Sequence, residues 1–199
     1  MFTRSGISAA LLFTLLAPAA VSAQTSAVDR PGPVFFASGG GSSALTDLND
    51  AGTASLNTGW TAGGGVGWQF NPYVAVRGTF DFAQAKGDGS GNAFTGQEFN
   101  NYYYGGDVQL RYPTTSGFAP YLLLGAGAVT IDNSDNAAFE SFTKFAGKGG
   151  AGVEYVVPGS NFGLFAQAAT YVYNYDRNGF DKTQADLLWT GGLSYRLAY

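Results

Sequence analysis

The feature that most constrains this chain is an alternation of apolar residues with small or polar residues, which recurs along most of its length. In the segment 187–199 one face carries only apolar residues, aromatic residues and glycine, whereas the other face carries Thr190, Ser194 and Arg196. The segment 101–112 follows the same rule, with its charged residues confined to one face. A period of two residues is the period of a β-strand. A shift of one residue would exchange the two faces, so the pattern assigns side chains to surfaces.

The alternation predicts eight strands of about 10 to 14 residues, long enough to cross a bilayer when tilted. They cover residues 33–42, 60–70, 73–83, 101–112, 118–131, 145–157, 162–175 and 187–199. The pattern leaves open which face points inward in 33–42, 118–131 and 162–175, because apolar or aromatic residues occupy both faces there.

The connections between these segments alternate in length. The short ones, at 71–72, 113–117 and 158–161, are rich in Pro, Gly and Asn, as tight turns require. The longer ones cover about 43–59, 84–100, 132–144 and 176–184 and are rich in Asp, Asn, Ser and Gly. Short turns at one end and long loops at the other are typical of membrane barrels. We therefore predict an all-β fold, an eight-stranded antiparallel up-and-down transmembrane β-barrel with both termini on the periplasmic side.

A membrane would also explain the composition. Charged residues make up only 12% of the chain and aromatic residues 16%, whereas a soluble domain contains roughly 25% charged residues. A sheet can span a bilayer only if it closes, since an unpaired backbone group in hydrocarbon costs several kcal/mol. The apolar face must then meet lipid and the polar face must point inward. We expect the aromatic residues at strand ends to form girdles on the outer surface, among them Trp68, Phe70, Tyr112, Tyr195 and Tyr199.

With these faces, the interior receives four positive and four negative side chains. They are Arg77, Asp81, Asp107, Arg111, Lys148, Glu154, Asp186 and Arg196. An eight-stranded barrel has little interior space, and an unpaired buried charge is strongly unfavourable. We expect these charges to pair and plug the barrel, with inward glycines leaving room for them. The functional alternative is a gated, narrow ion path.

The first 23 residues are expected to be a secretory signal peptide. They combine a positive start at Arg4, an apolar stretch at 9–17 and small residues at 21–23, as a cleavage site requires. Residues 24–32 would then form an N-terminal periplasmic segment and residues 33–199 the barrel. Removal of Arg4 with the signal changes the net charge from −4 to −5. The chain has no cysteine, so packing and hydrogen bonds must stabilise it without disulfides.

Several function classes are disfavoured by composition. The chain contains no His and no Cys, which removes zinc sites, thiol nucleophiles and every His-dependent catalytic arrangement. We therefore expect neither an enzyme nor a cofactor. The acidic residues of 132–140 lack the spacing of a calcium loop, so no metal site is predicted. Only ten Lys and Arg residues are present and they are scattered, which argues against a nucleic-acid partner.

Two segments carry a resemblance to a known family. The C-terminal pattern Leu193-x-Tyr195-x-Leu197-x-Tyr199 and the segment 120–127 are similar to the small outer-membrane β-barrels of the OmpA-like, OmpX-like and OmpW-like group. The resemblance covers residues 33–199. It implies a place in the bacterial outer membrane, contact with outer-membrane lipid, and recognition of the C-terminal pattern by the barrel-assembly machinery. Barrels of this group usually end in Phe, so Tyr199 is a departure.

Two functions remain open at this point. The first is a structural barrel that displays four acidic loops, with a summed charge of −5, and contributes to envelope integrity or adhesion. Divalent cations, basic proteins, or surface-layer and envelope proteins would be its partners. The second, which the OmpW resemblance implies, is a narrow channel for small or hydrophobic solutes. Its apolar path would use Tyr121, Leu123, Phe165, Tyr171 and Tyr173 if they face inward. A soluble lipid-binding barrel is disfavoured, because neither face carries enough charge to dissolve it.

Overall fold

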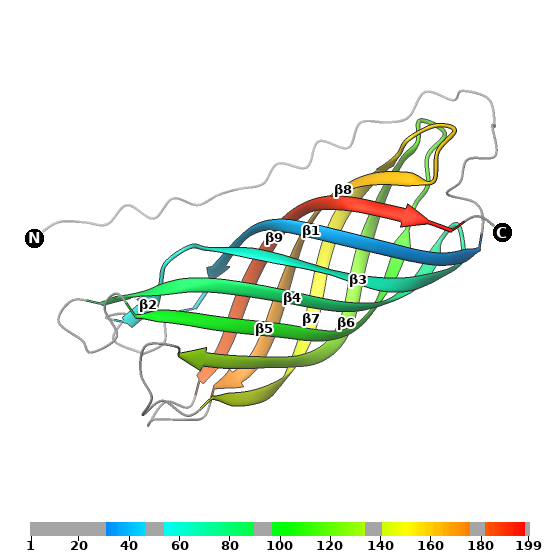
Figure 1. Cartoon of the computed structure of the whole chain (residues 1–199). Helices are drawn as coiled ribbons and strands as arrows, with labels where there is room; N and C mark the ends of the chain where they lie inside the picture. The colour runs from blue at the N-terminus through cyan, green and yellow to red at the C-terminus, as the bar shows by residue number, and fades with distance from the viewer. Residues whose placement is uncertain (1–30, 47–53, 90–96, 134–140, 176–181, 198–199) are drawn as a thin grey trace, which may run out of the picture.

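The regular elements of the chain are all β-strands. In a computed structural model, residues 31–46, 54–89, 97–133, 141–175 and 182–197 are described (Figure 1). The strands are β1 (Gly32–Ala44), β2 (Ala54–Leu56), β3 (Gly59–Asn71), β4 (Val74–Gly89), β5 (Glu98–Arg111), β6 (Phe118–Asn133), β7 (Phe142–Val156), β8 (Phe162–Tyr175) and β9 (Lys182–Arg196). No helix long and apolar enough to cross a membrane occurs in these ranges.

Eight of these strands form a closed antiparallel barrel. β1 pairs with β3 on one side and with β9 on the other, and the ring is completed where β4 pairs with β5. The other pairs of the ring join strands that are consecutive in the chain, and the short β2 pairs with the end of β4 outside the ring (Figure 1). Closure removes the free sheet edge that would otherwise leave a row of backbone groups without partners. The predicted eight-stranded up-and-down barrel is confirmed.

The two ends of the barrel differ. At one end, here named the turn end, three short connections join β3 to β4, β5 to β6 and β7 to β8. The Asn71 side chain accepts hydrogen bonds from the backbone N–H groups of Tyr73 and Val74, which closes the first turn. Gly117 and Gly159 have φ angles of 85° and 72°, a region that favours glycine, and they allow the other two turns. The opposite end is named the loop end.

The faces of the strands follow the predicted alternation. In β9, Ser194 and Arg196 are about 5% exposed or less, whereas the outward Leu193 is 57% exposed. The strands whose faces the sequence leaves open behave in the same way. In β6 the inward residues include Tyr121 and Leu123, and in β8 they include Phe165, Tyr171 and Tyr173; all five are buried. The interior therefore contains aromatic and aliphatic side chains as well as charges.

The outer surface carries an apolar band of membrane height. Trp60 and Phe70 lie ten residues apart on β3 and are both half exposed. Ten steps of about 3.4 Å along a strand tilted by about 40° correspond to roughly 26 Å, close to the apolar height of membrane barrels. Aromatic pairs lie at both limits of the band, such as Trp60–Phe82 near the loop end and Phe162–Tyr195 at the turn end.

The predicted girdle residues lie on this outer surface wherever the structure describes them. Trp68, Phe70 and Tyr112 are 45–67% exposed, and Tyr195 packs against the outward Phe162 with ring centroids 5.0 Å apart. Tyr199 lies outside the described residues.

Several strands are longer at the loop end than the sequence predicts. β4 continues to Gly89 rather than ending near 83, and β5 begins at Glu98 rather than 101. β2, which pairs with the end of β4, was not predicted and lies within the segment expected to be a loop. The added residues are largely polar and small, so the apolar alternation that identifies the membrane-spanning part does not extend to them.

Inward glycines are fitted to large neighbouring side chains. A Cβ atom at Gly163 would lie 2.7 Å from Glu154 Oε1, and one at Gly125 would lie 2.7 Å from the Cβ atom of Asp107. A Cβ atom at Gly152 would lie 2.5 Å from the ring of Tyr121. Real Cβ atoms do not approach other atoms this closely, so each glycine provides the space that its neighbour fills.

Gly149 and Gly150 are adjacent residues on opposite faces of β7. Substituting each of them tests which face of this strand points into the barrel. A Cβ atom at Gly150 would lie 2.5 Å from the backbone oxygen of Ala168, whereas one at Gly149 meets no atom within 4 Å. Gly150→Ala should therefore lower the free energy of unfolding by about 1–3 kcal/mol. Gly149→Ala should leave it unchanged or raise it by about 0.5–1 kcal/mol. Denaturant unfolding in lipid vesicles, followed by tryptophan fluorescence, measures both. Equal losses would contradict the assigned faces.

Candidate functional site

The structure places all eight charged residues named from the sequence inside the barrel. Each is at most 7% exposed. They come from β4, β5, β7 and β9 and occupy three levels along the barrel axis: a middle level, a level at the turn end and a level toward the loop end. They are Arg77, Asp81, Asp107, Arg111, Lys148, Glu154, Asp186 and Arg196.

The middle level is organised around Asp107. Arg77 Nε lies 2.7 Å from Asp107 Oδ1, and Lys148 Nζ lies 2.6 Å from Asp107 Oδ2. Arg77 is the direct cross-strand partner of Asp107, whereas Lys148 is two strands away. The residue between them in the register is Gly125, which has no side chain to block the approach. Lys148 also donates a hydrogen bond to the Thr79 hydroxyl at 3.2 Å. The Asp107 carboxylate thus binds two cations, and the Thr79 hydroxyl is a second partner for Lys148.

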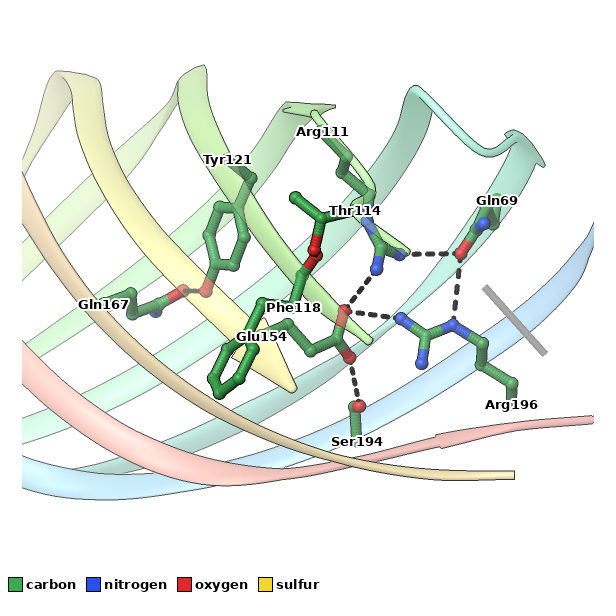
Figure 2. A network of polar contacts seen from close by, with 9 residues as sticks. All are labelled: Gln69, Arg111, Thr114, Phe118, Tyr121, Glu154, Gln167, Ser194 and Arg196. Atoms are coloured by element: carbon green, nitrogen blue, oxygen red, sulfur yellow. Dashed lines mark hydrogen bonds and ion pairs between the residues drawn. The ribbon is translucent and has the colours of Figure 1, made fainter. Parts of the chain in front are cut away.

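The level at the turn end is organised around Glu154 (Figure 2). Arg111 Nη2 and Arg196 Nη2 each lie 2.5 Å from Glu154 Oε2, and Ser194 donates a hydrogen bond to the other carboxylate oxygen. Gln69 Oε1 accepts hydrogen bonds from both arginines, at 2.7 and 3.1 Å. These five residues come from β3, β5, β7 and β9, so the network ties four strands together across the interior. Figure 2 shows Arg111 and Arg196 reaching toward Glu154 from different strands, with Gln69 between the two arginines.

The level toward the loop end is held by tyrosines rather than by cations. Tyr103 and Tyr173 donate hydrogen bonds to Asp186 Oδ2 at 2.7 and 2.8 Å. Nearer the middle, Tyr171 donates to Asp81 at 3.2 Å. The balance of four positive and four negative charges therefore does not produce four separate ion pairs. Two carboxylates take two cations each, and the other two carboxylates accept hydrogen bonds from phenol groups.

The tyrosine partners were not identified from the sequence. Tyr171 and Tyr173 were considered there as lining for an apolar path, although both present a hydroxyl donor to a buried carboxylate. Gln69, which joins the two arginines at the turn end, was also missed. The inward position of each residue follows from the alternation. Its partner across the barrel does not, because that partner depends on the register of strands far apart in the chain.

No arrangement suited to a metal ion occurs in the described ranges. No group of three or more His, Cys, Asp or Glu side chains gathers there. The carboxylates at the three levels are occupied by arginine, lysine, serine or tyrosine donors. Among the described residues, the site is an internal network of ion pairs and hydrogen bonds.

The described residues of the predicted assembly pattern, Leu193, Tyr195 and Leu197, lie on the outer surface of β9 or just beyond its end. Leu193 and Leu197 are 57% and 41% exposed, and Tyr195 contacts Phe162 on the outside. Tyr199 lies outside the described residues. None of the described members contributes to the internal network.

Comparison with known proteins agrees with this geometry. A family model described as outer membrane protein beta-barrel domain matches residues 8–199. A search of curated proteins gives no match. Three solved structures share the fold at low sequence identity. Neisserial surface protein A is 15% identical, with 85% of this chain and 100% of that chain covered and a TM-score of 0.62.

The other two come from different bacteria. Ail, the attachment invasion locus protein of Yersinia pestis, in a complex with the heparin analogue sucrose octasulfate, is 20% identical, with coverage of 83% and 99% and a TM-score of 0.53. The outer membrane protein OprG from Pseudomonas aeruginosa is 18% identical, with coverage of 86% and 99% and a TM-score of 0.51. At these identities the likeness establishes a common fold.

The turn-end level gives a direct test of the ion network. Glu154→Gln keeps the size of the side chain but leaves two buried guanidinium groups without their shared carboxylate. We expect a loss of roughly 3–5 kcal/mol in the free energy of unfolding. Ser194→Ala, the control, removes one hydrogen bond and should cost about 1–2 kcal/mol. Both are measured by denaturant unfolding in lipid vesicles. A loss for Glu154→Gln no larger than the control would contradict the proposed importance of the pairing.

Proposed function

The chain belongs to the outer membrane protein β-barrel family, and from that premise we propose that it is a closed scaffold acting through its surface. In this proposal the barrel stands in the outer membrane with its loop end toward the exterior and both termini in the periplasm. Its four loops, whose summed charge is −5, make the contacts, and they contribute to envelope integrity or adhesion.

The main support for the proposal is that side chains fill the interior of the barrel. Asp107 and Glu154 each join cations from different strands across the barrel, and Asp186 is hydrogen-bonded by Tyr103 on β5 and Tyr173 on β8. A solute crossing the barrel would have to break charge-assisted hydrogen bonds at two of these levels, each worth about 1.5–3 kcal/mol, and expose buried charges. A barrel closed in this way acts through the parts outside its interior.

The loops supply the chemistry of interaction in this proposal. Their summed charge of −5 comes mainly from Asp and Glu in 43–59 and 132–144, much of which lies outside the described residues. At the described base of the loops, Lys86 and Glu98 form an exposed ion pair at 3.4 Å. Exposed acidic groups attract cations over a Debye length of about 8 Å at physiological salt. The partners we propose are divalent cations, basic proteins, and basic segments of surface-layer or envelope proteins.

The similarity to the attachment invasion locus protein does not imply that the present chain binds the same ligand. That protein was solved with a heparin analogue, sucrose octasulfate, which carries many negative charges. The loops of the present chain are acidic and would repel a polysulfated ligand at close range. We therefore propose basic rather than sulfated partners for this barrel.

The channel alternative lacks a supporting observation of its own. The five residues considered for its path do face inward, but they are buried against other side chains. Tyr121, Leu123, Phe165, Tyr171 and Tyr173 are each at most 8% exposed. Tyr121 donates a hydrogen bond to Gln167, and Phe165 packs edge-on against Phe36. These contacts describe packing of the interior, so the scaffold remains the function we propose.

We propose two further properties. The first is that the outward row Leu193, Tyr195, Leu197 and Tyr199 is the segment that the barrel-assembly machinery recognises, since none of its described members is needed inside the barrel. The second is that the protein is not an enzyme. The chain has no His, and its buried carboxylates are held by donors that would compete with a substrate proton.

The loop proposal predicts a loss of binding when acidic loop residues are neutralised. In one variant Asp47, Asp50, Asp132 and Asp135 become Asn and Glu140 becomes Gln. Proteoliposomes with this variant should bind polylysine-coated beads much more weakly than wild type, and raised salt should remove the difference. The matched control, Asp176→Asn with Arg177→Gln, changes two residues of the connection 176–184 without changing net charge and should bind as wild type. Undiminished binding by the neutralised variant would refute a role for the acidic loops.

The closed interior predicts an absence of conductance. In planar bilayers the wild-type barrel should show no sustained single-channel current. Asp107→Ala removes the middle carboxylate but leaves the levels of Glu154 and Asp186 in place, so it should also remain closed. In the same preparations, unboiled protein should migrate differently on a gel from boiled protein. This difference verifies that the barrel is folded. A wild-type current that changes with Asp107→Ala would favour the gated ion path instead.

A further inference from the structure

Asp186 of β9 is a buried carboxyl group that has no cation partner among the described residues. Asp107 and Glu154 each bind two cations. Asp81 forms no ion pair either, but the two cations of the middle level lie close enough to attract its charge. No cation acts on Asp186 in this way, because its described interactions are with phenol groups alone. The loop-end level therefore carries a negative group that its protein neighbours do not neutralise.

The hydrogen bonds of Asp186 leave one of its two carboxyl oxygens free. Tyr103 of β5 and Tyr173 of β8 both donate to Oδ2, at 2.7 and 2.8 Å. Oδ1 accepts no hydrogen bond in the described part of the chain. The Asn101 amide donates to the Tyr103 oxygen at 3.3 Å, and the Asn101 Oδ1 atom is buried without a donor. This level thus lacks both a positive charge and a hydrogen-bond donor.

The other side chains around Asp186 do not supply the missing charge. Its register partners are Ala44 on β1 and Tyr171 on β8, and the Tyr171 hydroxyl donates to Asp81 of β4. Lys144 lies on the inward face of β7, but its interactions do not include Asp186. The tyrosines of this level belong to a buried cluster whose larger apolar members are Phe99, Ile131, Phe142 and Leu188.

We propose that Asp186 binds a proton on Oδ1 when the loop end is packed as described. Burial disfavours the charged form of a carboxyl group, and two neutral phenols compensate for it less than a cation does. Asp186 is only 4% exposed, and a proton needs no cavity and no further ligand. The bound proton takes the place of the cations that neutralise Asp107 and Glu154, and it gives this level an additional donor. When the proton leaves at alkaline pH, a buried charge without a cation remains and the loop end loosens.

Infrared difference spectroscopy tests for the proton directly. Wild type and the isosteric variant Asp186→Asn are folded into lipid vesicles and compared at neutral pH, where exposed carboxyl groups are ionised. The wild type should show the C=O stretching band of a protonated carboxylic acid, shifted in heavy water, and Asp186→Asn should lack it. Asp81→Asn is the matched control, because Asp81 is also buried and bonded by a phenol, and this variant should keep the band. Gel mobility without boiling verifies that each variant is folded.

The pH dependence of unfolding gives a second readout. The unfolded chain releases the Asp186 proton above about pH 4, whereas the folded barrel keeps it, so a rise in pH favours unfolding of the wild type. Relative to Asp186→Asn, the unfolding equilibrium constant of the wild type should increase about tenfold per pH unit from about pH 5, until Asp186 ionises in the folded barrel. Denaturant unfolding in vesicles at a series of pH values measures this ratio.

Three results would overturn the proposal. The first is a wild type without a carboxylic acid band at neutral pH. The second is a band that persists in Asp186→Asn or disappears in Asp81→Asn. The third is a ratio of the two unfolding constants that does not change with pH, since a hydrogen-bonding role of an ionised Asp186 would leave it constant over this range.

Discussion

The structure depends on the neutralisation of charge inside a cylinder only eight strands wide. Asp107 and Glu154 each accept two cations, and these contacts join strands that do not pair with one another. Removing an unpaired charge from water would cost several kcal/mol, so each cation requires its carboxylate in place. The long side chains fit because glycines such as Gly125 and Gly163 lie beside them. Some of the glycines in this chain are thus needed to pack charged side chains into a narrow interior.

The same constraint explains the outer surface. With the polar residues required inside, the outward positions are filled by apolar and aromatic side chains, many of them half exposed, such as Trp60, Phe70 and Leu193. In water this surface would associate with other molecules, whereas in lipid it needs no further partner. Backbone pairing completes the arrangement, because a closed ring of antiparallel strands satisfies the groups between strands.

Much of this arrangement is contained in local sequence pattern. The alternation placed Arg77, Asp107 and Glu154 on inward faces, and the short connections rich in Pro, Gly and Asn located the turn end. The pattern could not show that Lys148 reaches Asp107 past Gly125, because that contact depends on the register of three strands. It also could not show that Tyr103 and Tyr173 meet at Asp186, since 70 and more residues can separate such partners. The local pattern therefore predicts which face of a strand a residue occupies. The partner that this residue meets inside the barrel depends on how the whole ring of strands closes.

The distribution of partners along the axis indicates how the two ends differ. At the turn end, two arginines surround one carboxylate and the network has a net positive charge. Toward the loop end, Asp186 accepts hydrogen bonds from two tyrosines within a cluster that includes Phe99, Ile131 and Leu188. The negative end of the interior is therefore the loop end. Because strands on opposite sides are tied together at fixed positions, the strand ends that carry the loops are held at fixed spacing. In the function proposed above, a barrel tied together in this way acts through its membrane-facing wall and the surfaces at its two ends.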